Sequence, residues 1–281
     1  MDENALLDLK RLRSALAHEI VGHTIDYHAS LQSAMIPART LAADPTTPSG
    51  VVVTAEEQRQ GRGRLGRTWQ APFARALLNA AILKAPHLPP HPARLAMIAG
   101  LAVVDALEIT IPELAGRAWL KWPNDVLIIE HKPDEEVQGK VAGVLIESSF
   151  QGGIMKYGLL GIGVNVNQRA HELPSTPPGS PPAVSLFTAL DREVDRTDLL
   201  IELCRALGRY VTGPAAASVE QRWRERLHTL GRPVTITCQS GRTLEQVQGM
   251  AVDVTPAGEL VVEDATGARR RFAAGDVTLR V

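Results

Sequence analysis

Apolar residues along this 281-residue chain follow several periodicities, and each predicts a different kind of secondary structure. Between residues 3 and 21 they recur every three or four positions, which predicts an amphipathic helix. From Ala93 to Ile109 nearly every position is apolar, which predicts a helix packed in the interior. Three more helices are predicted, near residues 33–43, 197–212 and 217–229.

Short apolar runs bounded by turn-forming residues predict the strands. They lie at residues 51–55, 76–83, 118–130, 140–148 and 154–167. The last three follow one another with short connectors, which indicates antiparallel hairpins rather than helical crossovers. This order favours an α+β fold with a mixed, largely antiparallel sheet, and it disfavours an all-parallel, doubly wound fold.

The pattern changes near Gly231, after which short strands alternate with glycine-containing turns. Such a segment of about fifty residues predicts a small, separate β-barrel. We therefore expect a helical extension over residues 1–24, a main domain over residues 25–230 and the barrel over residues 231–281. The strand at residues 163–167 is also a candidate edge for pairing with a second copy or with a partner protein.

Composition narrows the class of protein. Hydrophobic residues make up 44% of the chain and charged residues 22%, as in ordinary globular proteins. The net charge of −1 gives no overall positive surface for nucleic acid or membranes. No apolar run is long enough to cross a bilayer, and the acidic N-terminus does not resemble a signal peptide. The widely spaced Cys204 and Cys238 indicate neither a disulfide framework nor a cysteine metal site, so we expect a reducing cytoplasm.

The most distinctive stretch is GRGRLGRTW, residues 61–69, which follows an apolar run. Glycine lets the backbone approach a ligand closely, and arginine offers forked donors to carboxylate and phosphate oxygens. The stretch therefore predicts a loop that holds an anion. Its glycines also fit a dinucleotide-binding pattern and nearly fit a P-loop, but no helix follows directly. A solvated basic surface loop is the simpler alternative.

Two later segments combine side chains suited to binding. KWPND, residues 121–125, places a cation, an aromatic ring, an amide and a carboxylate around a proline that fixes the backbone. It predicts either a ligand-binding turn covered by its tryptophan or a turn whose tryptophan is simply packed. Lys140 precedes a small, apolar strand where its ammonium group can project into a cleft, and Gly143 leaves room for a ring against the backbone. GIGVNVN, residues 161–167, repeats this combination of glycine and amide.

Taken together and in order, QRQGRGRLGRTW, KWPNDVLI, KVAGVLIE and GIGVNVN resemble the signatures of the biotin protein ligase family. The resemblance extends over residues 25–281. It implies a class II synthetase-like catalytic domain with an SH3-like C-terminal barrel. It also implies ATP-dependent formation of biotinyl-5′-AMP, with Mg²⁺ accompanying ATP, and transfer of biotin to a lysine of a biotin carboxyl carrier domain of acetyl-CoA carboxylase.

The resemblance implies roles for individual residues. Those matching biotin-binding positions are Ser33, Gln58, Gly61, Arg62, Lys140 and Gly143. Those matching ATP- and adenylate-binding positions are Arg64, Arg67, Trp69, Asn124, Asp125, Asn165 and Arg280. We expect Arg62 and Lys140 to supply positive charge where two anions meet, and Asp125 to assist deprotonation of the target lysine. No protein-held metal site is expected, and the loop is expected to order over its ligand.

The chain also departs from the family pattern. Ala34 stands where the family usually has threonine, which removes a ligand hydrogen bond worth about 1 kcal/mol. Transcriptional repressors of the family carry an N-terminal winged-helix domain, whereas a single short helix is predicted here, so we expect no DNA binding. Two alternatives stay open: a lipoate or octanoate ligase with a longer apolar pocket, and a biotin-binding regulatory module without turnover.

Overall fold

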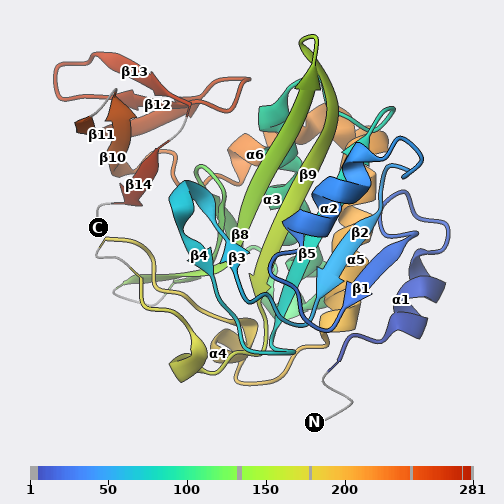
Figure 1. The fold of residues 1–281 in the computed structure, drawn as a ribbon. Helices are drawn as coiled ribbons and strands as arrows, with labels where there is room; N and C mark the ends of the chain where they lie inside the picture. The colour runs from blue at the N-terminus through green and yellow to red at the C-terminus, as the bar shows by residue number, and fades with distance from the viewer. Residues whose placement is uncertain (1–5, 132–134, 177–178, 241–242, 274, 280–281) are drawn as a thin grey trace.

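The computed structural model of the protein describes residues 6–131, 135–176, 179–240, 243–273 and 275–279. At its centre is a seven-stranded sheet (Figure 1). In spatial order the strands are β1 (Ile25–His28), β2 (Val52–Ala55), β5 (Ala76–Lys84), β9 (Ile154–Asn165), β8 (Glu136–Gln151), β7 (Asp125–His131) and β6 (Ala118–Lys121). Only the β1–β2 pair is parallel among these neighbours. The predicted α+β fold with a largely antiparallel sheet is confirmed.

Helices cover both faces of this sheet (Figure 1). The thicker layer contains α3 (Pro92–Thr110), α5 (Arg196–Thr212), α6 (Val219–Glu225) and, packed on α5, α1 (Leu9–Leu16). On the opposite face α2 (Met35–Ala43) packs over β2, β5 and β9. The central part of α3 is buried on all sides, as its continuous apolar run predicts.

The first two helices differ from the prediction in their boundaries. The first helix ends at Leu16, well before residue 21, and Asp8 caps its start by accepting a hydrogen bond from the N–H of Arg11. The second begins one residue later than a Ser33 cap requires. Ala34 occupies its cap position with helical backbone angles and no side-chain bond. Ser33 therefore does not cap α2, and its hydroxyl is left for another role.

The segment at residues 118–130, predicted as one strand, is a hairpin of β6 and β7. Lys121 pairs with Asp125, so the three residues from Trp122 to Asn124 form the turn between the strands. Trp122 is 1% exposed and lies inside the protein. The turn that both interpretations of KWPND predict is therefore confirmed, and it divides the predicted strand in two.

The predicted use of residues 163–167 as a sheet edge is wrong. Within β9, Gly163 and Asn165 pair with β5, and Gly163 also pairs with Gly143 of β8. This strand lies in the interior of the sheet. Its glycines serve the packing of other side chains, as described below, and cannot pair with another chain.

A second, five-stranded antiparallel sheet follows the helices and forms the lobe at the upper left of Figure 1. Its strands, in spatial order, are β13 (Arg269–Phe272), β12 (Leu260–Glu263), β11 (Thr243–Val254), β10 (Pro233–Ser240) and β14 (Asp276–Leu279). The predicted change to short antiparallel strands after Gly231 is confirmed. The boundaries at residues 24 and 230 stay predictions.

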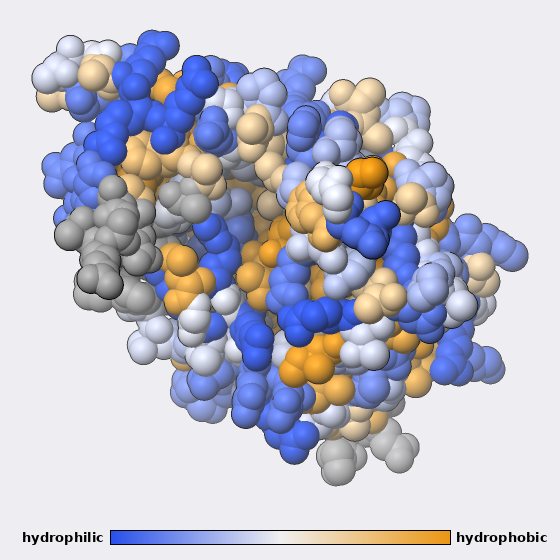
Figure 2. Space-filling view, turned by 45° about the horizontal axis from the view of Figure 1, so that its top comes forward, coloured by the Kyte–Doolittle hydropathy of each residue, from blue (hydrophilic) through white to orange (hydrophobic). Residues whose placement is uncertain are grey.

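The molecular surface in Figure 2 is mostly hydrophilic, with hydrophobic residues visible in separate groups. Large apolar side chains are exposed at Leu65, on the loop after β3, and at Phe150 and Ile154, near the tip of the β8–β9 hairpin. None of the described helices is both long enough and apolar enough to pass through a membrane.

Polar contacts join the C-terminal sheet, and the segment that leads into it, to the main sheet. The N–H of Trp122 donates to Thr229 Oγ1 at 2.9 Å, and its indole Nε1 donates to the carbonyl oxygen of Gly258 at 2.9 Å. Beside this contact, His228 Nε2 lies 3.0 Å from Glu136 Oε1, and Arg232 Nη2 lies 2.8 Å from Glu136 Oε2. The two sheets therefore meet at the KWPND turn.

The buried His228 makes this junction sensitive to acid. Burial, aided by the positive charge of Arg232, lowers the pKa of His228 to about 4, although Glu136 acts in the opposite direction. Between pH 4 and about 6.5 the unfolded chain binds a proton that the folded chain does not, so stability is lost as the pH falls through this window. This difference in the pKa of His228 between the folded and unfolded chain corresponds to a loss of about 3 kcal/mol in the free energy of unfolding.

We therefore expect the free energy of unfolding to fall less steeply with acid in H228Q than in the unchanged protein. Denaturant titrations at several pH values between 4 and 7 measure the difference between the two slopes. Parallel slopes for the two proteins would contradict a neutral, buried His228.

Candidate active site

The glycine–arginine stretch folds as a short hairpin of β3 (Gly61–Arg62) and β4 (Thr68–Trp69). The N–H of Gly63 donates to the carbonyl oxygen of Arg67 at 2.7 Å and closes the loop between the strands. At Gly61 a Cβ atom would lie 2.3 Å from the carbonyl oxygen of Trp69. Backbone atoms cannot yield as side chains do, so the pairing of these strands requires glycine at position 61.

Trp69 carries the hairpin onto the main sheet. A Cβ atom on Gly163 would lie 2.6 Å from the indole, and one on Gly143 would lie 3.0 Å from it. These two glycines are paired neighbours on β9 and β8. Gly161, two residues earlier on β9, faces Met35 of α2, so the indole rests on the α2 side of the sheet. Paired glycines leave a flat surface on which an aromatic ring can lie.

Lys140 reaches the same surface because β8 is irregular. Val126 pairs with Ala142 whereas Leu127 pairs with Lys140, so Val141 is an extra residue that forms a β-bulge. In a regular strand the side chains of Lys140 and Gly143, three positions apart, would lie on opposite faces of the sheet. The extra residue at the bulge places both positions on the same face. The side chain of Lys140 consequently lies beside Gly143, with Cε 3.5 Å from the position of a Cβ on that glycine.

The ammonium group of Lys140 is held between a carboxylate and an aromatic ring. Its Nζ lies 2.6 Å from Asp125 Oδ1 and 5.8 Å from the centroid of the Trp69 ring. The side chains of Lys140 and Asp125 are 27% and 17% exposed, so the pair is accessible to a ligand while being largely shielded from water. An ammonium at such a position attracts an anion more strongly than one in bulk water.

A second contact joins the hairpin to the KWPND turn. Arg64 Nη1 donates to Asn124 Oδ1 at 3.1 Å, and Asn124 Nδ2 donates to the carbonyl oxygen of Val144 at 2.7 Å. The side chain of Asn124 thus links the hairpin to β8. The structure brings together Arg64, Trp69, Asn124, Asp125, Lys140 and Gly143 of the predicted site.

Gln58 and Ser33 form another part of the predicted site, beside the start of α2. Gln58 Oε1 accepts a hydrogen bond from the N–H of Ala34 at 2.7 Å, and Gln58 bridges to Leu31 as in a parallel sheet. Ser33 is 1% exposed, and its hydroxyl has no hydrogen-bond partner within the described parts of the chain. The same holds for Nε1 of Trp69. Buried polar atoms of this kind are usually satisfied by a ligand or water.

Three other predicted site residues have different surroundings. Arg62 and Arg67 are exposed on the hairpin. Asn165 is 3% exposed and uses its amide within the protein: Nδ2 donates to the carbonyl oxygen of Val184, and Oδ1 accepts from Gln168. Arg280 lies outside the residues that the structure describes. Roles for these four residues stay predictions.

The interpretation of Trp122 as a ligand cover is wrong, and the alternative of a packed tryptophan holds. Its indole donates to Gly258 in the C-terminal sheet.

The W122F variant should lower the free energy of unfolding by about 1–2 kcal/mol, because the carbonyl of Gly258 loses its donor. W119F is the matched control, since Trp119 donates from a more exposed position to Gly116, and it should change stability by less than about 0.5 kcal/mol. Denaturant unfolding measures both, and equal effects would contradict the assignment.

Sequence reasoning did not assign Gly163 to the site. It lies in the GIGVN segment, two residues from Gly161. Alternate glycines in a buried strand indicate that something packs closely on one face, and this signal was available from the sequence. Met35 covers the first of these glycines and Trp69 covers the second.

A surface hollow also lies away from the hairpin. It has a volume of about 570 Å³ and is lined by residues of α1, α3 and α5, including Arg11, Ile109 and Arg205. It lies in the thicker helical layer, on the far side of the sheet from Trp69. Arg11 and Arg205 form ion pairs with neighbouring carboxylates, and none of the sequence motifs reaches this hollow. We therefore place the candidate site at the hairpin.

Comparisons with known proteins agree on one family. Residues 39–165 match the model described as biotin/lipoate A/B protein ligase family, and residues 229–280 match the biotin protein ligase C-terminal domain. A biotin–acetyl-CoA-carboxylase ligase of Paracoccus denitrificans is 33% identical over 236 residues, which cover 81% of this chain and 94% of that protein. One of Mycobacterium tuberculosis is 30% identical over 275 residues, 96% and 95% of the two chains. Among solved structures, a biotin protein ligase of Aquifex aeolicus in complex with biotin and ATP has a TM-score of 0.67 at 23% identity, and the match covers 92% of this chain and 98% of that one.

Proposed function

Because this chain belongs to the biotin–acetyl-CoA-carboxylase ligase family, we propose that biotin and ATP react between the hairpin at residues 61–69 and the sheet face formed by β7, β8 and β9. The protein is a ligase that uses ATP to convert biotin to biotinyl-5′-AMP and transfers the biotin to a carrier protein. The observation that supports this location is that Lys140 lies beside Trp69, next to the paired glycines Gly143 and Gly163.

The reaction requires positive charge at one point. The carboxylate of biotin must attack the α-phosphate of ATP, and both reactants are anions. Lys140 is placed to lie between them, and Asp125 holds its ammonium in position at 2.6 Å. Arg62 is a second source of charge on the hairpin. Their contribution is electrostatic positioning rather than covalent catalysis.

ATP reacts as its magnesium complex, in which Mg²⁺ neutralises charge on the phosphates. Within the described residues no three or more acidic, histidine or cysteine side chains are grouped as a metal cage. In such reactions Mg²⁺ is usually bound through one or two carboxylates together with substrate phosphates. Asp125 is the carboxylate that would take this part, with Asn124 as a neighbouring oxygen donor.

The biotin end of the site is assigned to the polar groups beside α2. Ser33 offers a buried hydroxyl, and Gln58 and Gly61 lie on the segment that leads into the hairpin. Ala34 uses its backbone N–H to orient Gln58, so this position retains a binding role without the missing threonine hydroxyl. A ureido ring, which has both donors and acceptors, is complementary to such a set.

The hairpin itself would exclude water from the mixed anhydride. Trp69 covers one side of the site, and the Arg64–Asn124 bond holds the loop against the KWPND turn. Shielding a reactive intermediate in this way prevents its hydrolysis. We further propose that the hairpin orders over its ligands, and that Asp125 accepts the proton of the attacking lysine. The carboxylate is already engaged by Lys140, so its positioning role has the stronger geometric support.

One experiment tests the function directly. The protein is incubated with biotin, MgATP and a biotin carboxyl carrier domain, and the mass of the carrier is measured. The expected result is the addition of one biotinyl group at one lysine. Lipoate and octanoate replace biotin in parallel reactions, and release of pyrophosphate with either in preference to biotin would overturn the assignment. Binding of biotin without any pyrophosphate release would instead indicate a regulatory module.

Two finer properties remain proposals. We propose the cytoplasm as the site of action, supported by the free thiols of Cys204 and Cys238. A homodimer is also retained as a prediction, to be checked by light scattering. Within the described part of the main sheet, β1 is an edge strand that pairs on one side only, and it replaces residues 163–167 as the candidate edge.

A further inference from the structure

A buried ion pair lies at the base of the hairpin segment, outside the residues assigned to substrate. Arg196 Nη2 is 2.7 Å from Glu56 Oε2, and the two side chains are 3% and 0% exposed. Arg196 Nη1 also donates to the carbonyl oxygen of Ala76 at 3.0 Å. Burying two charges is unfavourable unless their geometry is good and their other polar atoms are satisfied. Such a pair is therefore a costly feature that invites a functional explanation.

The pair joins the two strands between which the hairpin segment runs. Glu56 directly follows β2, and Ala76 begins β5. The N–H of Ala74 donates to the carbonyl oxygen of Glu56 at 3.1 Å, which closes the segment of residues 57–73 at its base. Gln58 and the whole hairpin lie within this segment. Arg196, from the first turn of α5, thus binds both sides of the base at once.

The N-terminal segment completes the surroundings of the Glu56 carboxylate. Glu56 Oε1 accepts hydrogen bonds from the N–H of Leu7 at 2.8 Å and from the hydroxyl of Tyr27 at 3.1 Å. The adjacent Asp8 donates its N–H to Thr197 Oγ1 at 3.0 Å.

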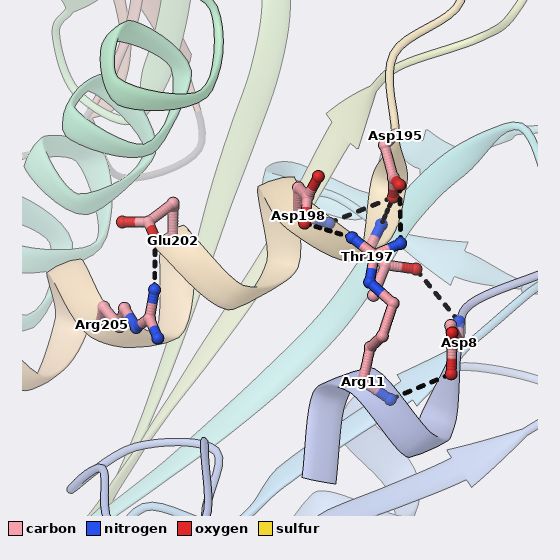
Figure 3. Close-up of polar contacts among 7 residues, drawn as sticks. All are labelled: Asp8, Arg11, Asp195, Thr197, Asp198, Glu202 and Arg205. Atoms are coloured by element: carbon pink, nitrogen blue, oxygen red, sulfur yellow. Dashed lines mark hydrogen bonds and ion pairs between the residues drawn. The ribbon is translucent and has the colours of Figure 1, made fainter. Parts of the chain in front are cut away.

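Figure 3 shows how the same segment is fastened to α5. The side chain of Arg11 points from α1 to Asp195 and Asp198, at the start of α5. Asp195 in turn caps this helix by accepting from the N–H groups of its first turn. The Leu7 N–H is thereby kept in place next to the buried carboxylate.

We propose that Glu56, Arg196 and the segment of residues 7–11 form a base clamp, which fixes the base of the hairpin segment and so positions Gln58, Gly61 and Trp69 for substrate. Glu56 and Arg196 are positioning residues that touch no reactant. The inference rests on the proposed function, since it takes the substrates to bind under the hairpin. It gives the N-terminal helix a part in the ligase reaction, although that helix lies in the opposite layer from the site.

The physical basis is the entropy of the loop. A segment of this length with an exposed tip samples many conformations unless its ends are held at a fixed separation and direction. Anchoring both strand ends restricts these conformations before substrate arrives, which lowers the cost of closing the hairpin over it. A clamp of this kind acts on substrate affinity and on local opening. An ion pair that merely supports the core would act on the stability of the whole domain.

The test compares R196K with R209K in the full-length protein. Lysine keeps the charge at position 196 but cannot reach both Glu56 and Ala76 with a planar fork. Arg209 lies on the same helix, is exposed and pairs with Asp105, away from the hairpin segment and the N-terminal helix, so the same substitution at this position is the matched control. Hydrogen exchange is measured on peptides covering residues 57–73 and, as an internal reference, β8 and β9. The KM for biotin and the kcat of pyrophosphate release are measured on the same preparations.

For R196K we expect exchange in residues 57–73 to accelerate by about tenfold with unchanged exchange in β8 and β9, because opening becomes local. The KM for biotin should rise by about 10- to 100-fold as the hairpin is displaced. R209K should match the unchanged protein in both measurements. Unchanged exchange in residues 57–73, or acceleration to the same degree in β8 and β9, would overturn the base clamp.

A milder variant covers the case in which R196K does not fold. Y27F removes one donor to Glu56 and leaves the ion pair in place. It should accelerate exchange in residues 57–73 by a smaller factor, again without effect on β8 and β9, and no change there would overturn the proposal. Hydrogen exchange can be measured whether or not the protein is active as a ligase, so the two proposals can fail separately. If exchange changes as expected while the unchanged protein forms no biotinyl-5′-AMP, the proposed function fails and the clamp stands.

Discussion

The K140A variant is expected to reduce biotin-dependent release of pyrophosphate by about 100- to 1,000-fold, since removing a single preorganised charge from a water-poor site has effects of this size. The ammonium lies 2.6 Å from Asp125 and beside Trp69, where biotin carboxylate and ATP phosphate are proposed to meet. Without it, two anions must approach next to an unpaired carboxylate. The rate should therefore fall further than the loss of one attraction alone would cause. Pyrophosphate release under saturating biotin and MgATP is the measurement.

Two comparisons make this result specific. K84A removes a lysine that donates to backbone carbonyl oxygens of Asp44 and Thr47, remote from the site, and should leave the rate unchanged. The double variant K140A/D125N also removes the unpaired carboxylate, so a rate above that of K140A measures the repulsion, less what is lost with the proposed Mg²⁺ contact of Asp125. Near-normal pyrophosphate release by K140A would remove Lys140 from the mechanism and, with it, the placement of the site.

The second large effect is expected for G61A. The added Cβ would lie 2.3 Å from the carbonyl oxygen of Trp69, so β3 and β4 cannot pair as they do here. Trp69 would then lose its place over Gly143 and Gly163. A displacement of about 1 Å at a reacting site can reduce the rate by about 100-fold, and we expect a loss of this order in biotinyl-5′-AMP formation.

Gly63 provides the control within the same hairpin. A Cβ on Gly63 would meet its nearest neighbour in Arg67 at 3.5 Å, an ordinary van der Waals distance, and its backbone angles are extended. G63A should therefore keep the hairpin and lose only a few-fold in rate, on the scale of a surface substitution. Equal losses in the two variants would show that the strand pairing of the hairpin is not what positions Trp69.

Much of the fold could be predicted from the pattern of apolar residues. The buried α3 and the strands β2 and β5 follow from continuous apolar runs, and the antiparallel order of β7 to β9 follows from the short connectors. The polar strand β1, partly exposed along its length, has no such run and was missed. The same is true of the two-residue strands β3 and β4, because their pairing depends on close backbone approach at Gly61 and not on burial.

The sequence motifs were easier to recognise than the set of residues that lie together in the site. Lys140 and Gly143 are three residues apart, so regular alternation would place their side chains on opposite faces of β8. They share a face because of the bulge at Val141, and nothing in the apolar sequence around it signals an extra residue. Trp122 shows the reverse problem. Its place in KWPND left ligand contact and simple packing both open, and only the tertiary contact with Gly258 decides for packing.

The base clamp also has a consequence for the order in which the chain acquires its structure during synthesis. Translation proceeds from the N-terminus, so Glu56 and the hairpin emerge from the ribosome long before Arg196 has been made. Until α5 is complete, the carboxylate of Glu56 lacks its buried counter-ion and the strand ends on either side of the hairpin are held only by backbone bonds. The segment expected to close over biotin lies in the first third of the chain, yet its anchoring depends on Arg196, in the last third. Nascent chains halted before residue 196 should therefore be unable to retain the adenylate.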